Sequence, residues 1–367
     1  MKILYVINSV EGGGAALPVP AIVAALQKAG AEVHVVALTR RNGKALPAFE
    51  RAGLRVSIRE GGEKDHRRAL RWLNEQIDRD RPDLIWTSLT RATLLGQWAG
   101  QQAGVPVVSW QHNAFLKPSN RWLLRARRKA ALLWVADSAS VARLTEERLG
   151  LRADRVITWP IFAADPKAPQ ASPWRPGQLL ELGSLGRLHP NKGYDLLIDA
   201  LAELKGSGFQ PAAPYRVTIG GEGADEAVLR AKAADAGIEE LHFAGFVADT
   251  RGFLTGLHAY LQPSRREGFC IAAHEAMQAG LPVLGTRTGE MPFTINEGQT
   301  GWLAPPGDKR ELAEALRRLL SAPERLAGMG HAARQTVLDR FAQQQFEEIA
   351  AIILKRVATF RSDRGHL

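Results

Sequence analysis

The feature that most constrains this chain is an alternation of short apolar runs with helical patterns, which occurs twice. In the first half, the apolar runs that favour strands lie at residues 3–7, 34–38, 83–87, 105–110, 133–136 and 155–159. In the second half they lie at residues 179–185, 216–219, 241–243, 259–262 and 282–285. Strands that alternate with helices need crossover connections, so each half is predicted to form a parallel sheet with helices on both faces.

The break between the halves is a segment with the composition of a linker. Residues 163–177 contain four prolines and show little periodicity. A chain of 367 residues also exceeds what one hydrophobic core usually serves. We therefore predict an α/β protein with two Rossmann-like domains, at residues 1–165 and 166–340, followed by a helical segment at 341–367. In that last segment, apolar residues recur at helical spacing: Phe346, Ile349, Ile353 and Val357.

Composition and charge restrict the class of protein. The chain is 45% hydrophobic and 23% charged, as is usual for a folded globular protein. No window reaches the roughly 18 apolar residues of a membrane span, and no signal-peptide pattern precedes the first predicted strand. With a single cysteine, Cys270, an internal disulfide is excluded. We expect a cytoplasmic protein.

The net charge of +10 lies entirely in the first half. Residues 1–165 hold 25 Lys and Arg against 15 Asp and Glu, whereas residues 166–367 hold 23 of each. Six of the cations lie between residues 117 and 129, interleaved with Phe115, Leu116, Trp122, Leu123 and Leu124. We expect a helix capped by Ser119 that meets an anionic membrane surface. A solvated face packed by its leucines is the alternative. No nucleic-acid-binding module accompanies the charge, so we expect no nucleic-acid partner.

Three glycine-rich turns follow predicted strands. Gly13 and Gly14 lie in a loop that leads into a helix, where free N–H groups suit an anion or a hydroxyl group. The pattern is not G-x-G-x-x-G, and the second strand ends in Thr-Arg-Arg without an acidic residue, which leaves only a weak dinucleotide reading. The third turn, residues 220–223, is compatible with a phosphate or is simply a tight turn.

The second of these turns, at the start of the second domain, also carries two cations. Gly186 and Arg187 follow a strand, and Lys192 precedes a helix. Cations at the carboxyl end of a parallel strand are suitably placed for a diphosphate, and an Arg guanidinium can bind two oxygens at once. The alternative for each is an ordinary surface cation.

The segment from residue 263 to 283 carries the most chemical information. Glu267 and Glu275 are eight positions apart, and Gly268 allows Glu267 to remain in a loop while Glu275 lies about two turns into the following helix. Both can then face one ligand. Ionised carboxylates accept hydrogen bonds from several hydroxyl groups, which suits the recognition of a sugar nucleotide.

Together these motifs resemble a retaining glycosyltransferase of family 4 with the GT-B fold, in which two Rossmann-like domains face a central cleft. The resemblance covers residues 180–310 strongly and the first domain loosely. The matching features are the element from Gly186 to Ala200, the turn at 220–223, the segment 243–247, the E-x7-E motif from Glu267 to Glu275, and Gly280 to Val283 with Gly289 and Gly301 to Leu303.

The resemblance implies a role for individual residues. Arg187 and Lys192 would neutralise the donor diphosphate, Glu275 would bind the nucleotide ribose, and Glu267 would contact the transferred sugar. His112 matches the histidine that reaches the donor sugar from the first domain; considered alone, it would more often be a structural residue. The family commonly returns its last helix to the first domain. The implied donor-binding set also includes Gly13, Gly14, Gly186, Gly221, Phe246, Val247, Gly268, Phe269 and Cys270.

Two departures from the family pattern concern the donor sugar. Cys270 occupies a position where many relatives have glycine, and residues 288–292 replace the more usual Gly-Gly pair. Because Cys270 begins a helix, we expect the helix dipole to favour its thiolate, a buried inert thiol being the alternative. Asp78-Arg79-Asp80 looks like a metal-binding D-x-D motif, but it precedes a strand and so lies at the wrong end of the sheet. We expect no metal and no other cofactor.

The sequence thus predicts an enzyme that moves a hexose-type sugar from a nucleoside-diphosphate sugar to a hydroxyl acceptor with retention of configuration. A UDP-sugar is favoured and GDP-mannose comes next. The expected acceptor is a glycolipid, lipopolysaccharide or polysaccharide precursor, at the inner face of the cytoplasmic membrane. Two alternatives stay open: a nucleotide-sugar epimerase of the same architecture, and a non-catalytic sugar-nucleotide-binding partner.

Overall fold

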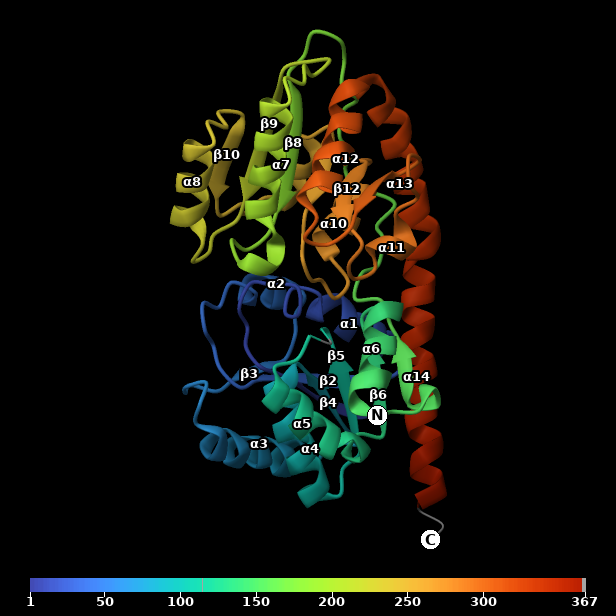
Figure 1. Cartoon of the computed structure of the whole chain (residues 1–367). Coiled ribbons are helices and arrows are strands. Elements are labelled where there is room, and N and C mark those ends of the chain that lie inside the picture. Colours follow the sequence, from blue (N-terminus) through green and yellow to red (C-terminus); the bar gives the residue numbers. More distant parts are fainter. Residues whose placement is uncertain (114, 365–367) are drawn as a thin grey trace. The chain divides into compact units, whose positions relative to one another are not determined.

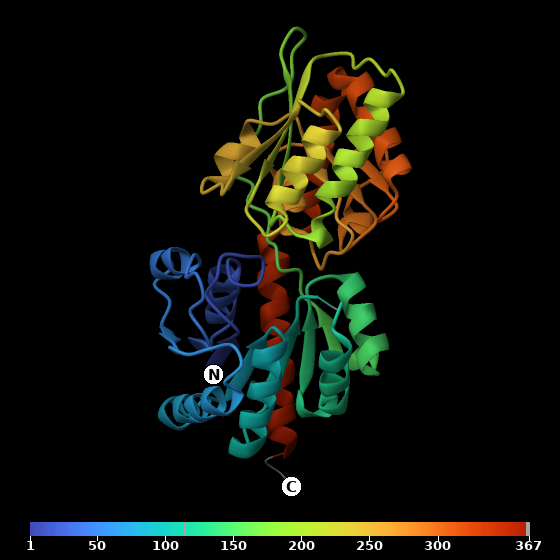
Figure 2. The ribbon, with the colours of Figure 1, turned by 60° about the vertical axis from the view of Figure 1, so that its left-hand side comes forward.

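The computed structural model describes residues 1–113 and 115–364 and divides the chain into two compact units. Unit 1 combines Met1–Phe162 with the chain from Gln343 onward, and unit 2 is Ala163–Ala342 (Figures 1 and 2). The sequence-based boundaries stand at 165 and 340. Unit 1 is therefore built from both ends of the chain, and unit 2 from its middle.

Unit 1 holds a seven-stranded parallel sheet. Its elements, in chain order, are β1 (Lys2–Ile7), α1 (Val19–Lys28), β2 (Glu32–Ala37), α2 (Leu46–Arg51), β3 (Val56–Ile58), α3 (His66–Asp80), β4 (Leu84–Ser88), α4 (Thr90–Ala103), β5 (Val107–Gln111), α5 (Pro118–Ala126), η1 (Arg128–Ala130), β6 (Leu133–Ala136), α6 (Ala139–Leu149), η2 (Ala153–Arg155), β7 (Val156–Thr158) and, from the end of the chain, α14 (Gln343–Arg364).

Unit 2 holds a six-stranded parallel sheet. Its elements are β8 (Leu180–Leu185), η3 (Pro190–Lys192), α7 (Tyr194–Gly206), β9 (Tyr215–Gly220), α8 (Glu226–Asp235), β10 (Leu241–Gly245), α9 (Thr250–Thr255), β11 (Ala259–Gln262), α10 (Ile271–Gln278), β12 (Val283–Thr286), α11 (Met291–Thr294), β13 (Gly301–Ala304), α12 (Lys309–Ser321), η4 (Pro323–Arg325) and α13 (Leu326–Arg340).

Both sheets have the doubly wound strand order. It is β3-β2-β1-β4-β5-β6-β7 in unit 1 and β10-β9-β8-β11-β12-β13 in unit 2, and every described strand pair is parallel. The central strands β4 and β5 are buried at every position because helices cover both faces of the sheet. The predicted pair of Rossmann-like α/β domains is confirmed.

Two strands, β3 and β13, were not predicted from the sequence. Edge strand β3 has three residues, all half-buried, so it lacks a continuous apolar run. Strand β13 is fully buried but has four residues and starts at a glycine. Helix α1 begins at Val19, because residues 14–18 form turns between the glycine loop and the helix.

The final helix belongs to unit 1. The buried side chains of α14 are Phe346, Ala350, Ile353, Leu354 and Val357, which recur at the helical spacing. The ring of Phe346 lies 5.0 Å from that of Trp159, and Glu347 pairs with Lys28 of α1 at 2.6 Å. In Figure 2, α14 (red) lies behind the strands of unit 1, with the cyan helix α4 in front of them. Among the described residues, no helix combines the length and the apolar character that a membrane span requires.

Candidate functional site

The candidate donor-binding residues lie where the strand order of unit 2 reverses. Strand β8 has β9 on one side and β11 on the other, so the connections that leave β8 and β11 run in opposite directions. In open α/β sheets this reversal leaves a crevice at the carboxyl ends of the two strands, and ligands bind there. Arg187 and Lys192 follow β8, and Glu267 follows β11. Two motifs that are 75 residues apart in sequence therefore meet.

Lys192 and Glu267 form the central ion pair of this site. The Lys192 Nζ donates to Oε1 of Glu267 at 2.7 Å, and both side chains are largely buried. Burial lowers the pKa of Lys192, but the nearby Glu267 carboxylate more than offsets this and raises it above its usual value. Lys192 is therefore a permanent cation.

Two residues that the sequence reasoning missed fix the position of Glu267. Ser264 Oγ donates to Glu267 Oε1 at 2.6 Å, and Gln262 Nε2 reaches the same oxygen at 3.2 Å. Gln262 is held in turn by the Tyr260 hydroxyl, which donates to its Oε1 at 3.1 Å. Ser264 and Gln262 have no exposed surface. The available signal was the polar pair at the end of an otherwise apolar strand, because buried polar groups need partners.

Glu275 has a different environment. It lies in α10, half-buried, and its carboxylate makes no hydrogen bond or ion pair with any residue that the structure describes. Burial raises its pKa from 4.5 to about 7. Arg187 is exposed and likewise has no ion-pair partner among the described residues. Within the described part of the chain, the site thus offers one carboxylate and one guanidinium group without a protein partner.

The glycines of the two turns serve the packing of the backbone. The N–H groups of Gly186 and Gly221 donate to Gly220 O and Gly245 O at 2.9 and 2.7 Å, so neither N–H is free for a phosphate. A Cβ on Gly221 would lie 1.9 Å from Gly186 O, and its φ of +144° is one that side chains rarely adopt. These glycines let the turns after β8 and β9 approach each other.

The segment from Gly268 to Cys270 contributes less side-chain chemistry than expected. Gly268 O would lie 2.7 Å from a Cβ on Gly289, so the turn after β12 lies directly against this segment. The ring of Phe269 is buried, 4.2 Å from that of His274 and 5.2 Å from that of Phe341. Because its ring is buried, Phe269 could contact a nucleotide-sugar donor only through its backbone.

The expectation of a reactive Cys270 thiolate is wrong. The side chain is 6% exposed, and burial raises the pKa of the thiol well above its usual value. The residue has a φ of +74°, in the left-handed region that favours glycine. This backbone conformation gives a physical reason why glycine suits the position.

Other predicted donor contacts are placed as follows. Phe246, just after β10, is 53% exposed. Val247 packs toward Gly220, where a Cβ would lie 2.6 Å from its Cγ2. Residues 288–292, which differ from the family pattern, follow β12. Among them, Glu290 is buried and pairs with Arg340 at 2.7 Å. Its carboxylate thereby ties this turn to the end of α13.

The first unit places His112 directly after β5, within a hydrogen-bonded group. Its Nδ1 lies 3.0 and 3.1 Å from the two oxygens of Asp137, and its Nε2 lies 2.6 Å from Ser88 Oγ. All three side chains are buried. Gly13 and Gly14 lie in the loop after β1, in turns that precede α1. Asp137 and Ser88 were not predicted, although each ends a buried strand or follows one directly.

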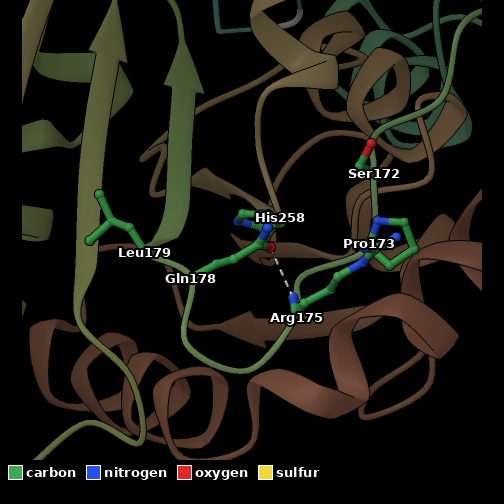
Figure 3. Close-up of a pocket in the computed structure, with 6 residues that line it drawn as sticks. All are labelled: Ser172, Pro173, Arg175, Gln178, Leu179 and His258. Carbon is green, nitrogen blue, oxygen red and sulfur yellow. Dashed lines mark hydrogen bonds between the residues drawn. The ribbon is translucent and has the colours of Figure 1, made fainter.

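The D-x-D-like residues lie at the end of α3. Asp80 accepts a hydrogen bond from Arg55 at 2.9 Å and is paired with His34. A surface pocket lies at the amino ends of β8 and β11 in unit 2, lined by residues of the end of the linker, by residues 178 and 179 and by His258 (Figure 3). Within it, the Arg175 N–H donates to Gln178 Oε1 at 3.1 Å. This pocket is at the opposite end of the sheet from Glu267.

Comparison with known proteins adds independent information. The family model described as "Glycosyl transferases group 1" matches residues 170–336, and that described as "Glycosyltransferase Family 4" matches residues 12–162. The phosphatidyl-myo-inositol mannosyltransferase of Mycobacterium leprae is 30% identical over 264 residues, which are 70% of this chain and 67% of that protein. The amylovoran biosynthesis glycosyltransferase AmsK of Erwinia amylovora is 33% identical over 49% of this chain and 46% of its own length.

The solved structure of HepE from Anabaena, in complex with UDP and glucose, shares the fold. It has a TM-score of 0.84 at 22% sequence identity and covers 97% of this chain and 99% of its own. The chain spans 62% of the length of one curated relative, the 2-deoxystreptamine glucosyltransferase of Streptomyces kanamyceticus, and 46% of AmsK. Two family models, which together cover both units, and the mannosyltransferase match lead to one conclusion: the chain belongs to glycosyltransferase family 4 and has the GT-B fold.

Proposed function

We propose that this protein transfers a hexose-type sugar from a nucleoside-diphosphate sugar to a hydroxyl group, with retention of anomeric configuration and without a metal ion. A UDP-sugar is the first candidate donor and GDP-mannose the second. The acceptor is a glycolipid, lipopolysaccharide or polysaccharide precursor. HepE was solved with UDP, and the relatives include a mannosyltransferase and an enzyme of amylovoran biosynthesis, which supports this range.

One observation carries the proposal: Lys192 pairs with Glu267 at the strand-order reversal of unit 2, and α10, the next helix, carries Glu275, whose carboxylate has no partner among the described residues. Negative charge grows on the leaving diphosphate during transfer, and a preorganised cation stabilises it. Lys192 is held by a carboxylate, while Arg187 is exposed and available. We assign the diphosphate to both cations, the ribose hydroxyls to Glu275 and the transferred sugar to Glu267 and His112.

The test compares two lysines that are paired alike. Lys192 and Lys232 each donate to a carboxylate at 2.7 Å, but Lys232 pairs with Asp199 between α8 and α7. With UDP-glucose or GDP-mannose and a hydroxyl acceptor, Lys192→Ala is expected to lower the turnover at least about a hundredfold, whereas Lys232→Ala should not. Both variants must keep the wild-type circular dichroism spectrum. Equal turnover in the two would contradict the assignment, and unchanged turnover in EDTA would support the metal-independent reaction.

Two other functions predict different products. An epimerase, or simple hydrolysis of the donor, releases nucleoside diphosphate without a glycosylated acceptor. A binding module shows nucleotide-dependent thermal stabilisation without turnover. Analysing acceptor, donor and released nucleotide in the same reaction separates all three, and determining the anomeric configuration of the product tests retention.

We further propose that helix α5 contacts an anionic membrane, where a lipid-linked acceptor would be found. Trp122 is 69% exposed and Leu123 is also exposed, while Leu124 is the only residue of this helix that is buried. The exposed cations around them are Lys117, Arg121, Arg125 and Lys129. Cations beside an exposed indole match an anionic lipid surface in charge and chemistry. The location at the inner face of the cytoplasmic membrane rests on this contact.

A further inference from the structure

His274 is a buried polar side chain of unit 2 that the proposed donor contacts do not use. It directly precedes Glu275 in α10 and has no exposed surface. Its ring lies beside two phenylalanine rings, with its centroid 4.2 Å from that of Phe269 and 5.3 Å from that of Phe341. A buried polar group needs hydrogen-bond partners, so the partners of its two ring nitrogens show what the residue does.

The first partner determines where the hydrogen of His274 lies. Nδ1 is 2.8 Å from Cys270 O, and a carbonyl oxygen only accepts hydrogen bonds, so Nδ1 carries a hydrogen. Burial lowers the pKa of His274 from 6.5 to about 4; the hydrogen bond to Cys270 O does not offset this, and the positive charge of Arg340 adds to it. The imidazole is therefore neutral at pH 7, and Nε2 holds a lone pair.

The second partner is the hydroxyl of Thr294. Its Oγ1 lies 3.1 Å from His274 Nε2 and 3.3 Å from Glu290 O. A hydroxyl has a single hydrogen to donate, and the shorter contact places it on the lone pair of Nε2. His274 thereby joins Cys270, which directly precedes α10, to Thr294, which ends α11.

The turn between β12 and α11 packs directly on Glu267. Gly289, in this turn, has a φ of +61°, and a Cβ there would lie 2.7 Å from Gly268 O and 2.9 Å from Glu267 Cβ. The N–H of Gly289 donates to no residue that the structure describes, which leaves it available for an oxygen of a ligand. The position of this turn therefore determines what lies next to the Glu267 carboxylate.

We infer that His274 is a positioning residue, which holds the turn after β12 against Glu267 in the conformation that receives the donor sugar. It does so with hydrogen on Nδ1 only, as a bridge between Cys270 O and the Thr294 hydroxyl. The inference rests on the proposed function, in which Glu267 contacts the transferred sugar.

The bridge can be broken from the Thr294 side without removing a ring from the core. Thr294→Val deletes the hydroxyl, and the ion pair between Glu290 and Arg340, at 2.7 Å, still holds the turn. Thr294→Ser keeps a hydroxyl and should restore the bridge. Thr145 provides a matched control, because it is buried and donates to Val141 O at 2.6 Å within α6 of unit 1. Thr145→Val therefore removes a comparable buried hydrogen bond elsewhere.

The first experiment measures the state of the ring. Full-length protein labelled with ¹⁵N-histidine is examined by NMR at pH 5.5, where an exposed histidine is charged, and the His274 signals are identified by their loss in His274→Gln. We expect a hydrogen on Nδ1 and none on Nε2. The Nε2 signal should shift in Thr294→Val and remain unchanged in Thr145→Val. A charged ring, a hydrogen on Nε2, or no shift in Thr294→Val would overturn the inference.

The second experiment separates the sugar from the nucleotide. Calorimetry gives the dissociation constants of UDP and UDP-glucose, or of GDP and GDP-mannose if the wild type binds that pair instead. We expect Thr294→Val to weaken binding of the nucleotide sugar about tenfold relative to the nucleotide, because a displaced turn affects the contacts of the sugar. Thr294→Ser and Thr145→Val should keep the wild-type ratio of the two constants, and all variants should keep the wild-type circular dichroism spectrum.

The outcomes distinguish a failure of the inference from a failure of the proposed function. If Thr294→Val weakens the nucleotide and the nucleotide sugar equally, or leaves both unchanged, while the wild type transfers sugar, His274 has a merely structural role and the inference alone is overturned. If the wild type binds neither nucleotide sugar, the proposed function and the inference are both overturned.

Discussion

The two carboxylates of the E-x7-E motif differ in what the protein provides for them. Glu267 Oε1 receives hydrogen bonds from Lys192, Ser264 and Gln262, whereas Glu275 has no partner among the described residues. A carboxylate that is already satisfied is rigid, and one that is buried without a partner favours its neutral form. The motif therefore combines a fixed group with one whose charge depends on its ligand.

This difference predicts an unusual pH dependence of stability. The folded pKa of Glu275 is about 7, against 4.5 for an ordinary glutamate, so between these values the folded chain keeps a proton that the unfolded chain has released. Rising pH therefore lowers the free energy of unfolding across this window, and the loss is complete above pH 7. We expect Glu275→Gln to be more stable than the wild type at pH 8, by at most about 3 kcal/mol, and to approach it toward pH 5.

Calorimetric unfolding at pH 5 and pH 8 measures this effect. Glu267→Gln serves as the contrast, because it leaves the buried cation of Lys192 without its counter-ion and should lower stability at both pH values. A loss of stability at pH 8 in both variants would contradict the environment assigned to Glu275.

The environment of Cys270 leads to one prediction about the reactivity of its thiol and one about backbone strain. Its thiol should not react with a disulfide reagent in the native protein and should react fully after unfolding, because only the exposed thiolate is nucleophilic. With a φ of +74°, Cys270→Gly should change the unfolding free energy by less than about 1 kcal/mol, whereas the β-branched Cys270→Val should cost about 1–3 kcal/mol. Rapid labelling of the native protein, or equal stability of the two variants, would count against this description.

Residue identities in the site were partly accessible from the sequence. The motif supplied Glu267, Glu275, Arg187 and Lys192, because their types and spacing suit a diphosphate and hydroxyl groups. The motif could not identify Gln262 or Asp137, since a polar residue beside a strand end acquires its role only from its neighbours across the sheet. It also misjudged Cys270, where burial outweighs any effect of the helix dipole.

At the scale of elements, the turn between η3 and α7 packs tightly against the segment that follows β11. Gly193 has a φ of +68°, and a Cβ there would lie 2.0 Å from Pro263 O, in the segment that leads to Glu267. Gly193→Ala should therefore push Lys192 away from Glu267, lowering both stability and turnover. Gly206→Ala in the same helix meets nothing within 4 Å and should be neutral or stabilising by up to about 1 kcal/mol. Thermal midpoints and turnover of both variants test this, and tolerance of Gly193→Ala would refute it.

Helix α5 gives a prediction about membrane binding. Co-sedimentation with anionic vesicles should fall about a hundredfold or more when Arg121, Arg125 and Lys129 are changed to Glu, since each cation contributes about 1 kcal/mol near such a surface. Arg127 is unsuitable for this test because it lies over the Trp98 ring and donates to Gln101. Changing the exposed α3 residues Arg67, Arg68 and Arg71 to Glu alters the net charge equally and should have a much smaller effect. Equal binding to neutral and anionic vesicles would reject the contact.

The presence of helices and strands was easier to predict than the residues at which they begin and end. The central strands were evident because burial on both faces produces continuous apolar runs, as in β4 and β5. The predicted Ser119 cap is wrong: α5 starts at Pro118, after Lys117, and no side chain caps it. A proline fixes the backbone for a first helical turn, so the helix can start there without a capping serine.

At the scale of the whole molecule, unit 1 depends on a helix from the far end of the chain. Phe346, Ile353 and Val357 of α14 are almost fully buried. Truncation after Ala342 removes these side chains and leaves Trp159 without its ring contact to Phe346. We expect a loss of several kcal/mol in unit 1, at about 1.5–3 kcal/mol per large buried apolar side chain, with unit 2 little affected. Proteolysis coupled to mass spectrometry locates the change, and uniform protection in both units would contradict it.

The division of the chain also sets an order of assembly during synthesis. The ribosome synthesises the first 162 residues, then all of unit 2, and only after these the helix α14 that completes unit 1. Unit 2 is contiguous and can complete its core while the ribosome is still translating, whereas the amino-terminal segment must wait with the surface beneath α14 uncovered. Helix α14 is therefore the element that closes unit 1, and a nascent chain that stalls before Gln343 exposes apolar surface to chaperones.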